Sequence, residues 1–299
     1  MSTQFIPSLL VPEIYFPAKS EKGFTVSLIE KMADQGFYQS YEIGDGQDQQ
    51  ERKGILALKE KHHFQLTQWL TFLIDQYNLD VSSVDTQLRL ESVKRIKESI
   101  YLAAECGASN IAFVPGADPG ADRRLEAVEG FYESLCEICE EASRYHMNVL
   151  VEHLDRYAHK KRLIGPMDET VQLLSRVKAD YQNIGLAFDT AHAALNGENI
   201  LDALELAKSH THQIHFSNAV LDQTSPLYGD YHMEIGEPGF LTVGKISDIL
   251  RKADELSLQS ETGLRVAVEV RGKDLENLQA NESTVRTILE NALNLVGSR

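Results

Sequence analysis

Four side chains that could bind a metal ion stand near the ends of apolar, β-prone segments. They are Glu152 in VLVEHL, Asp189 in IGLAFDT, His215 in QIHFSN and Glu269 in RVAVEVR. Three carboxylates and one imidazole make an oxygen-rich set, which suits divalent cations such as Mn²⁺, Mg²⁺ or Co²⁺, with Zn²⁺ as a further option. One polar residue at the end of a strand says little. Four of suitable type on successive segments predict a site for one divalent metal ion.

The spacing of these four residues fits successive strands of a β/α protein. The separations are 37 residues (152 to 189), 26 (189 to 215) and 54 (215 to 269). One β-α unit takes about 30 residues, and the last interval has room for a long loop at 219–239. A single acidic residue at such a place would more often cap a helix or form a surface ion pair. Three carboxylates in a ring, however, repel one another unless a cation or protons neutralise them.

The elements that would position these residues alternate along the whole chain. Apolar β-prone segments each precede an amphipathic helix-like segment, and this pattern predicts parallel strands joined by right-handed crossovers. Because there are eight such units and no linker-like stretch, we expect one (β/α)8 TIM barrel domain over residues 1–299. Its C-terminal face would carry the long loops 116–122, 155–167 and 219–239. Strands are expected at 4–11, 37–43, 63–70, 109–116, 149–154, 184–190, 213–218 and 265–271.

Five further polar residues follow the strands that carry the four ligand candidates. His192 would project beside the metal and bond a substrate hydroxyl, although a helix cap or a core position is the alternative. Asp230 and His232 form a D-x-H pair before a glycine turn, which suits either a second metal or the ordering of a loop. Arg156 and Asn218 are expected to contact substrate from the same face. Earlier in the chain, the ends of strands two and three carry polar groups that would line the pocket or pack in the core, namely Glu42 and Trp69.

Composition limits the classes of partner. The chain has 29 basic and 45 acidic residues, a formal net charge of −16, which repels phosphate backbones and anionic membranes. No segment approaches the ~20 apolar residues of a membrane span, and no basic, apolar leader is present. We therefore expect a cytoplasmic protein with a small-molecule, sugar-like substrate and neither a nucleic-acid nor a membrane partner. A homo-oligomer, dimer or tetramer, is left open.

Several segments together resemble a known family. VEHLDRYA, FDTAH, HFSN, HMEIGEPGF and VEV are similar to motifs of the xylose-isomerase-like barrel superfamily, especially its ketose 3-epimerase and hydroxypyruvate-isomerase branch. In that branch a glutamate, an aspartate, a histidine and a glutamate after strands five to eight bind one divalent metal. The resemblance implies the same role for the four residues above, and places three more residues in family motifs, namely Arg156, Tyr157 and His192.

Three positions depart from the pattern of the ketose 3-epimerases. The family asparagine before the arginine is Asp155 here, a glutamate two residues after the arginine is Ala158, and an arginine after the strand-seven histidine is Leu221. The last two usually contact substrate hydroxyls. The resemblance therefore supports metal binding more directly than it supports any particular sugar.

These observations predict an isomerase or epimerase of a small sugar or polyol-derived hydroxy-ketone. Glu152 and Glu269 would act as general acid and base on an enediolate intermediate. One alternative is a metal-dependent dehydratase that expels water from the same intermediate, and another is a catalytically silent barrel. An apurinic-site endonuclease would need histidines at the ends of strands three and four, where the chain reads QLTQWL and IAFVPG.

Overall fold

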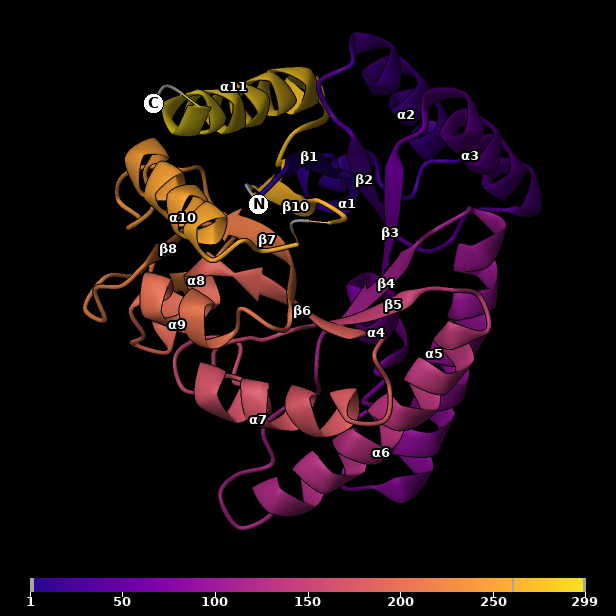
Figure 1. The fold of residues 1–299 in the computed structure, drawn as a ribbon, viewed down its shortest axis with the longest axis vertical. Coiled ribbons are helices and arrows are strands. Elements are labelled where there is room, and N and C mark those ends of the chain that lie inside the picture. The colour runs from indigo at the N-terminus through magenta and orange to yellow at the C-terminus, as the bar shows by residue number, and fades with distance from the viewer. Residues whose placement is uncertain (1–2, 260, 298–299) are drawn as a thin grey trace.

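Eight parallel strands close into a barrel surrounded by helices in the computed structural model, which describes residues 3–259 and 261–297 (Figure 1). The order around the barrel is β1-β10-β7-β6-β5-β4-β3-β2, so each strand lies beside its neighbour in sequence and the last closes on the first. The predicted (β/α)8 fold is confirmed. The strands are β1 (Phe5–Leu10), β2 (Ser40–Ile43), β3 (Gln65–Trp69), β4 (Asn110–Phe113), β5 (Asn148–Glu152), β6 (Ile184–Asp189), β7 (Thr211–Ser217) and β10 (Leu264–Glu269).

The helices of the β-α units pack around the outside of the barrel, and their apolar faces are buried against the strands. Local sequence sets several of their ends. The Asp48 carboxylate accepts hydrogen bonds from the backbone N–H groups of Gln50 and Glu51, and the Glu51 carboxylate accepts one from the backbone N–H of Asp48, which completes a capping box at the start of α3. These helices are α2 (Phe24–Gln35), α3 (Gln49–His62), α5 (Thr86–Glu105), α6 (Arg124–Ser143), α7 (Met167–Lys178), α9 (Ile200–Leu206), α10 (Val243–Glu255) and α11 (Leu278–Gly297).

Short elements that the sequence pattern did not predict follow the strands on the C-terminal face. They are too short to show a period of 3.6 residues, so no amphipathic signal marks them. A two-stranded antiparallel ribbon also lies inside the 219–239 loop. The short helices are α1 (Val11–Ile14), η1 (Phe16–Ala18), α4 (Thr71–Tyr77), α8 (Thr190–Leu195) and η2 (Leu275–Asn277), and the ribbon strands are β8 (Ala219–Val220) and β9 (Gly229–Asp230).

The barrel interior is filled, so the site has a solid floor. A layer of buried side chains lies inside the barrel, and Arg265 bonds Thr67 and Ser109 near the opposite end. The strand register then sets the height of the ligand candidates. Asp189 pairs with His215 across β6 and β7, while Glu269 pairs with Ser217, one inward-facing position higher. The members of the buried layer are Leu10, Trp69, Ala112, Leu150 and Ala187.

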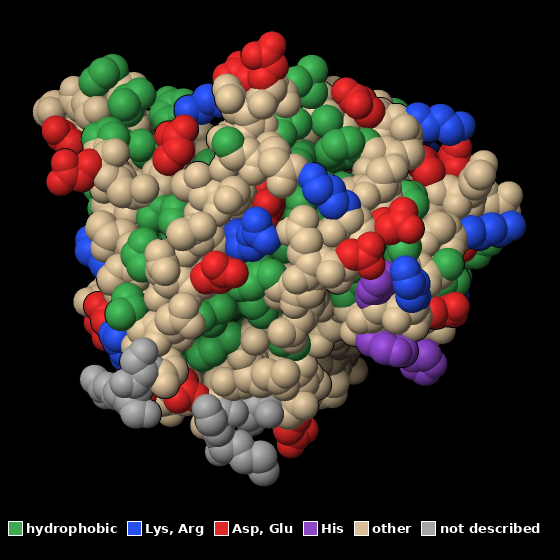
Figure 2. Space-filling view, turned by 90° about the horizontal axis from the view of Figure 1, so that it is seen from above, with side chains coloured by type: hydrophobic (Ala, Val, Ile, Leu, Met, Phe, Trp, Pro, Cys, Tyr) green, Lys and Arg blue, Asp and Glu red, His purple; other side chains and the backbone are tan. Residues whose placement is uncertain are grey.

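The outer surface is mixed in charge. On the face shown in Figure 2, acidic and basic side chains are interspersed and do not gather into one patch. Among the described residues, no helix is both long enough and apolar enough to cross a membrane.

Candidate metal centre and active site

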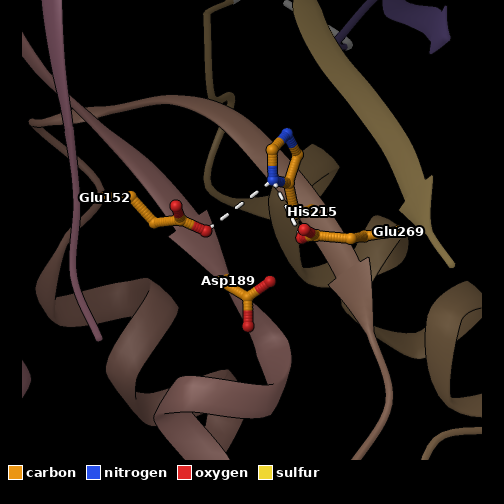
Figure 3. A group of neighbouring side chains, drawn as sticks. All are labelled: Glu152, Asp189, His215 and Glu269. Atoms are coloured by element: carbon orange, nitrogen blue, oxygen red, sulfur yellow. Dashed lines mark ion pairs between the residues drawn. The ribbon is translucent and has the colours of Figure 1, made fainter. Parts of the chain in front are cut away.

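The structure brings the four predicted ligands together at the C-terminal mouth of the barrel (Figure 3). Each offers one ligand atom, and these atoms all lie within 4.8 Å of one another. His215 Nδ1 is 3.3 Å from Glu269 Oε2 and 3.8 Å from Glu152 Oε1, so the imidazole faces a carboxylate on either side. Asp189 lies beside them at the end of β6. All four side chains are buried, as a metal centre requires.

Two polar atoms at the centre of this group lack a hydrogen-bond partner. Within the described part of the chain, neither His215 Nδ1 nor Asp189 Oδ2 makes a hydrogen bond, although both are buried. Buried polar atoms without a partner cost stability unless something outside the chain satisfies them. Oxygen atoms with one imidazole nitrogen are the donors that divalent cations take. The residues present therefore fit one divalent cation.

Glu42 fixes the orientation of the His215 ring from behind. Glu42 Oε2 accepts a hydrogen bond from His215 Nε2 at 2.9 Å and others from Gln213 and the indole of Trp69. Because Nε2 donates its proton to Glu42, Nδ1 is the nitrogen that faces Glu152 and Glu269 and would bind a metal once it loses its own proton. A carboxylate behind a ligating histidine holds the tautomer and makes the ring a better ligand.

Removing this carboxylate should weaken metal binding. We expect Glu42→Leu to lower Mn²⁺ affinity by about 10–100-fold, the usual cost of losing a partner behind a metal ligand, measured by isothermal titration. Glu42→Gln, which keeps an acceptor oxygen, should recover part of the loss. Glu282→Gln is the matched control, since Glu282 is equally buried but bonds Tyr38 far from the site. Equal Mn²⁺ affinity in Glu42→Leu and the control would contradict this role.

Two of the proposed ligands, Asp189 and His215, have raised pKa values in this buried group of carboxylates. Burial, together with the nearby charges of Glu269 and Glu152, raises the pKa of Asp189 to about 8, against the opposing effect of His192. Burial alone would lower the pKa of His215, but Glu42, Glu152 and Glu269 raise it well above its usual value. In the metal-free protein, protons thus balance charge that a cation would otherwise balance.

Metal loading should release protons. Asp189 and His215 both have raised pKa values and must both lose a proton to act as ligands, so protons compete with metal as pH falls. We therefore expect Mn²⁺ affinity to rise with pH from pH 6 through the pKa of Asp189, about 8, and to go on rising until His215 has also lost its proton. Titration in buffers of different ionisation enthalpy will count the released protons. An affinity that does not change over this pH range would contradict the assigned ligands.

His192 is held beside the metal centre by the first turn of α8. Asp189 Oδ1 caps this helix by accepting from the backbone nitrogen of His192 at 3.0 Å, which accounts for the D-x-x-H spacing. The ring pairs through Nδ1 with Asp155 Oδ2 at 3.2 Å. Burial alone would lower the pKa of His192, but Asp189 and Asp155 raise it to about 9. Asp155, which replaces the family asparagine, thus keeps this imidazole charged near the site.

His232 reaches the same centre from the 219–239 loop. Its Nδ1 lies 3.1 Å from Glu269 Oε1 and 3.0 Å from Glu13 Oε2, and its Nε2 lies 3.2 Å from Asp230 Oδ2. Glu13, His232 and Glu269 also bring ligand atoms within 4.8 Å of one another. However, both oxygens of Glu13 accept from Arg271, at 2.7 and 2.8 Å, so a cation there would compete with a guanidinium. We therefore interpret the D-x-H pair as ordering the loop around the site.

Two of the residues expected to contact substrate lie elsewhere. The Arg156 guanidinium is fully buried in a paired contact with Glu169, with both N···O distances at 2.7 Å. The side-chain amide of Asn218 is fully hydrogen-bonded to the 219–239 loop and the segment after it. Its Nδ2 donates to two backbone carbonyls, and its Oδ1 accepts from the backbone N–H of Leu241. Neither residue lines the cavity at the mouth. We correct both expectations: Arg156 and Asn218 position the loops and do not face a substrate.

A cavity of about 200 Å³ opens at this mouth, and three of the ligand candidates, Glu152, His215 and Glu269, line it. His192 and His232 line it, whereas Asp230 lies behind His232 and is buried. Ala158 and Leu221 are not part of its wall. Its wall combines charged side chains with apolar ones, so it would suit a small polar molecule. The apolar members are Leu10, Pro12, Trp69, Phe72, Val114 and Leu154.

Some of the charged residues in the cavity were not predicted from the sequence. Glu13 follows β1, and Arg271 follows β10 by two positions, so a search of all eight strand ends would have found both. Lys160 and Arg162 lie eight and ten residues beyond Glu152 in a long loop. The end of β5 does not predict where Lys160 and Arg162 lie, because their positions depend on how the loop folds back toward the barrel.

Comparison with known proteins agrees with this fold. The chain belongs to the xylose isomerase-like TIM barrel family, whose model matches residues 29–281. No curated protein sequence matches the chain. Three solved structures share the fold over 98% of this chain, each with a TM-score of 0.70.

All three are distant in sequence, so their likeness shows the fold. A D-tagatose 3-epimerase-like protein is 20% identical, with 98% of that chain covered. D-psicose 3-epimerase from Clostridium cellulolyticum H10, in a structure with D-tagatose, is 16% identical with 99% covered. The IOLI protein, in a structure with a bound zinc atom, is 14% identical with 98% covered.

Proposed function

We propose that this protein is a divalent-metal-dependent isomerase or epimerase of a small sugar or polyol-derived hydroxy-ketone. One observation carries the proposal: Glu152 and Glu269 flank the His215 imidazole at the floor of a small cavity, beside donor atoms that have no partner in the protein. Two of the structural neighbours are a D-tagatose 3-epimerase-like protein and a D-psicose 3-epimerase, and a third, the IOLI protein, holds zinc. These neighbours support the same class of reaction.

The two glutamates would move the proton. One carboxylate removes a proton from the carbon beside the substrate carbonyl, and the product is an enediolate. When bound, the divalent cation supplies positive charge that acidifies this carbon and stabilises the negative charge of the enediolate. Return of a proton to the opposite face of the same carbon, by the other carboxylate, gives an epimer. Return to the neighbouring carbon gives an isomer.

Two histidines would orient the substrate. His192 and His232 both line the cavity, and both have raised pKa values. His192 would present its Nε2–H to a substrate oxygen, because only its Nδ1 is held by Asp155, whereas His232, whose two ring nitrogens both face carboxylates, would shape the wall beside it. Expulsion of a β-hydroxyl from the same enediolate would make the enzyme a dehydratase, whose product absorbs in the ultraviolet. An endonuclease with three metals fits poorly, because Trp69 and Val114 stand where strands three and four would need histidines.

A deuterium-exchange assay tests the proposal. Metal-loaded protein in D₂O should place deuterium on the carbon beside the carbonyl of a substrate hydroxy-ketone, as followed by NMR. Exchange that does not depend on metal would contradict the proposed site, and an ultraviolet-absorbing product would indicate the dehydratase.

We expect weak activity on the usual free ketohexoses. Ala158 and Leu221 stand where ketose 3-epimerases carry polar contacts, and neither lines the cavity here. Each buried hydroxyl left without a partner costs about 1–3 kcal/mol, and a site that lacks the matching group selects against that hydroxyl. Rates on D-fructose and D-tagatose should therefore fall well below those of a native substrate. Efficient 3-epimerisation of either sugar would refute this expectation.

A further inference from the structure

Arg162 places a guanidinium with no hydrogen bond of its own in the wall of the cavity. Its side chain is 28% exposed, and its nearest charged partner is Asp75 Oδ1 at 3.8 Å, on a carboxylate that is 59% exposed. Within residues 3–259 and 261–297, this guanidinium donates no hydrogen bond. A long contact to an exposed carboxylate contributes little. The guanidinium has five N–H donors in a rigid fork, and here they are free for a ligand.

The other two cations in the cavity wall are already engaged. Lys160 Nζ lies 3.1 Å from Asp230 Oδ2, which is buried. Arg271 gives two hydrogen bonds to Glu13. Their charges are therefore largely balanced by the protein itself. Of the lysines and arginines that line this cavity in the described chain, Arg162 is the one that remains available.

The backbone holds Arg162 in a fixed place. Its nitrogen donates to Asp155 O at 3.1 Å, and the next residue, Leu163, donates to Gly116 O at 3.0 Å. An antiparallel bridge joins Arg162 to Ala117 in the loop after β4. The backbone that carries the guanidinium is thus held by two loops that are bonded to each other. A backbone that is ordered in advance loses less entropy when its side chain binds a ligand.

The guanidinium lacks a close partner although carboxylates are near. Glu13, Asp75, Glu152 and Glu269 also line the cavity, yet in the described chain only Asp75, at 3.8 Å, forms an ion pair with Arg162. An uncharged sugar needs no unpaired arginine. A planar guanidinium is well suited to the two oxygens of a carboxylate or phosphate.

We infer that Arg162 binds an anionic group, a carboxylate or a phosphate, on the substrate. This inference rests on the proposed function. The hydroxy-ketone end of the substrate would lie over Glu152, Asp189, His215 and Glu269, and the anionic end would lie against the loop that carries Arg162. Asp75, the carboxylate nearest to the guanidinium, competes with this anion.

Three probes that share a hydroxy-ketone test the inference. D-Fructose is neutral, 5-keto-D-gluconate carries a carboxylate and D-fructose 6-phosphate carries a phosphate, so the two charged probes separate the two sources of the anion. We expect at least one charged probe to bind Mg²⁺-loaded protein about tenfold or more tightly than D-fructose, by isothermal titration. Arg162→Ala should remove roughly 10- to 100-fold of that affinity, the effect of one charge-assisted hydrogen-bonded pair, without weakening D-fructose.

Two further variants separate this role from a structural one. Arg162→Lys keeps the charge without the fork and should retain part of the affinity. Asp75→Asn removes the competing carboxylate and should tighten the charged probe, which is opposite in sign to the effect of Arg162→Ala. Arg176→Ala is the control, because Arg176 pairs with Glu129 on the surface and should change nothing.

The outcomes distinguish this inference from the proposed function. The anion site is overturned if wild-type protein binds all three probes equally well, or if Arg162→Ala does not weaken binding of a charged probe. In either case the proposed metal-dependent reaction still stands if binding requires metal. Charged probes that bind through Arg162 equally well without metal support the anion site and overturn the proposed function. Absence of binding by every probe overturns both.

Discussion

Glu152→Gln and Glu269→Gln should each lower turnover by roughly 10²–10⁴-fold, the usual contribution of a general acid or base, with the barrel still folded. An amide keeps the shape of the side chain but cannot accept and return a proton. Each glutamate is buried at the mouth of the barrel, and each lies to one side of His215 Nδ1. The measurement is deuterium transfer from D₂O into a substrate hydroxy-ketone, followed by NMR.

Controls separate lost chemistry from lost metal and lost fold. Metal content and thermal unfolding should be measured for both variants, because both residues are also proposed ligands. Glu137→Gln, a change on the exposed surface of α6, should leave exchange unchanged. If either active-site variant loaded with metal exchanged deuterium at the wild-type rate, the assignment of that glutamate would be wrong.

Asp189→Asn and His215→Ala should each lower metal affinity by more than the ~10–100-fold expected for a residue behind the ligands. Both side chains offer a buried atom that has no partner in the described protein, His215 Nδ1 and Asp189 Oδ2. Asp189→Asn removes a negative charge, and His215→Ala removes the nitrogen donor of the set. Mn²⁺ titration of each purified variant gives the change directly.

The fold of the variants decides how this result is interpreted. Asp189 also caps α8 through a side-chain oxygen, and asparagine caps a helix about as well as aspartate, so Asp189→Asn should unfold at close to the wild-type temperature. A variant with lowered stability and unchanged metal affinity would show that the residue is only structural. Unchanged affinity in both variants would remove the basis for the metal centre.

The barrel could be predicted because its signal repeats. Eight apolar, β-prone segments alternate with amphipathic ones, and a parallel sheet of this kind has few alternative topologies. Short elements such as α4 and α8 escaped prediction, since six or seven residues show no clear period. The β8–β9 ribbon escaped for the same reason, because it has only two residues in each strand.

The sequence could predict that the four proposed ligands lie close together, because each of them lies near the end of a strand. In a closed barrel the ends of parallel strands meet at one face, and residues near these ends lie side by side, as Asp189 and His215 do. Glu42 was named as a residue that would line the pocket or pack in the core. Its actual place behind His215 depends on where the imidazole points, which a sequence does not state.

Residues in loops could not be placed in this way. Arg156 belongs to a family motif, yet its guanidinium turns away from the cavity to meet Glu169 in α7. Arg162, six positions further along, turns into the cavity because the loop bonds back to Asp155 and to the segment after β4. Long side chains in long loops are positioned by contacts between segments that are distant in sequence.

Wild-type protein stripped with a chelator and then titrated with Mg²⁺ in D₂O, with a panel of neutral and anionic hydroxy-ketones, tests the central claim most directly. We predict that at least one compound gains deuterium on the carbon beside its carbonyl, that exchange rises to a plateau at about one equivalent of metal, and that an epimer or isomer appears with it. Exchange that is insensitive to metal, or conversion without deuterium in the product, would contradict an enediolate reaction at this site.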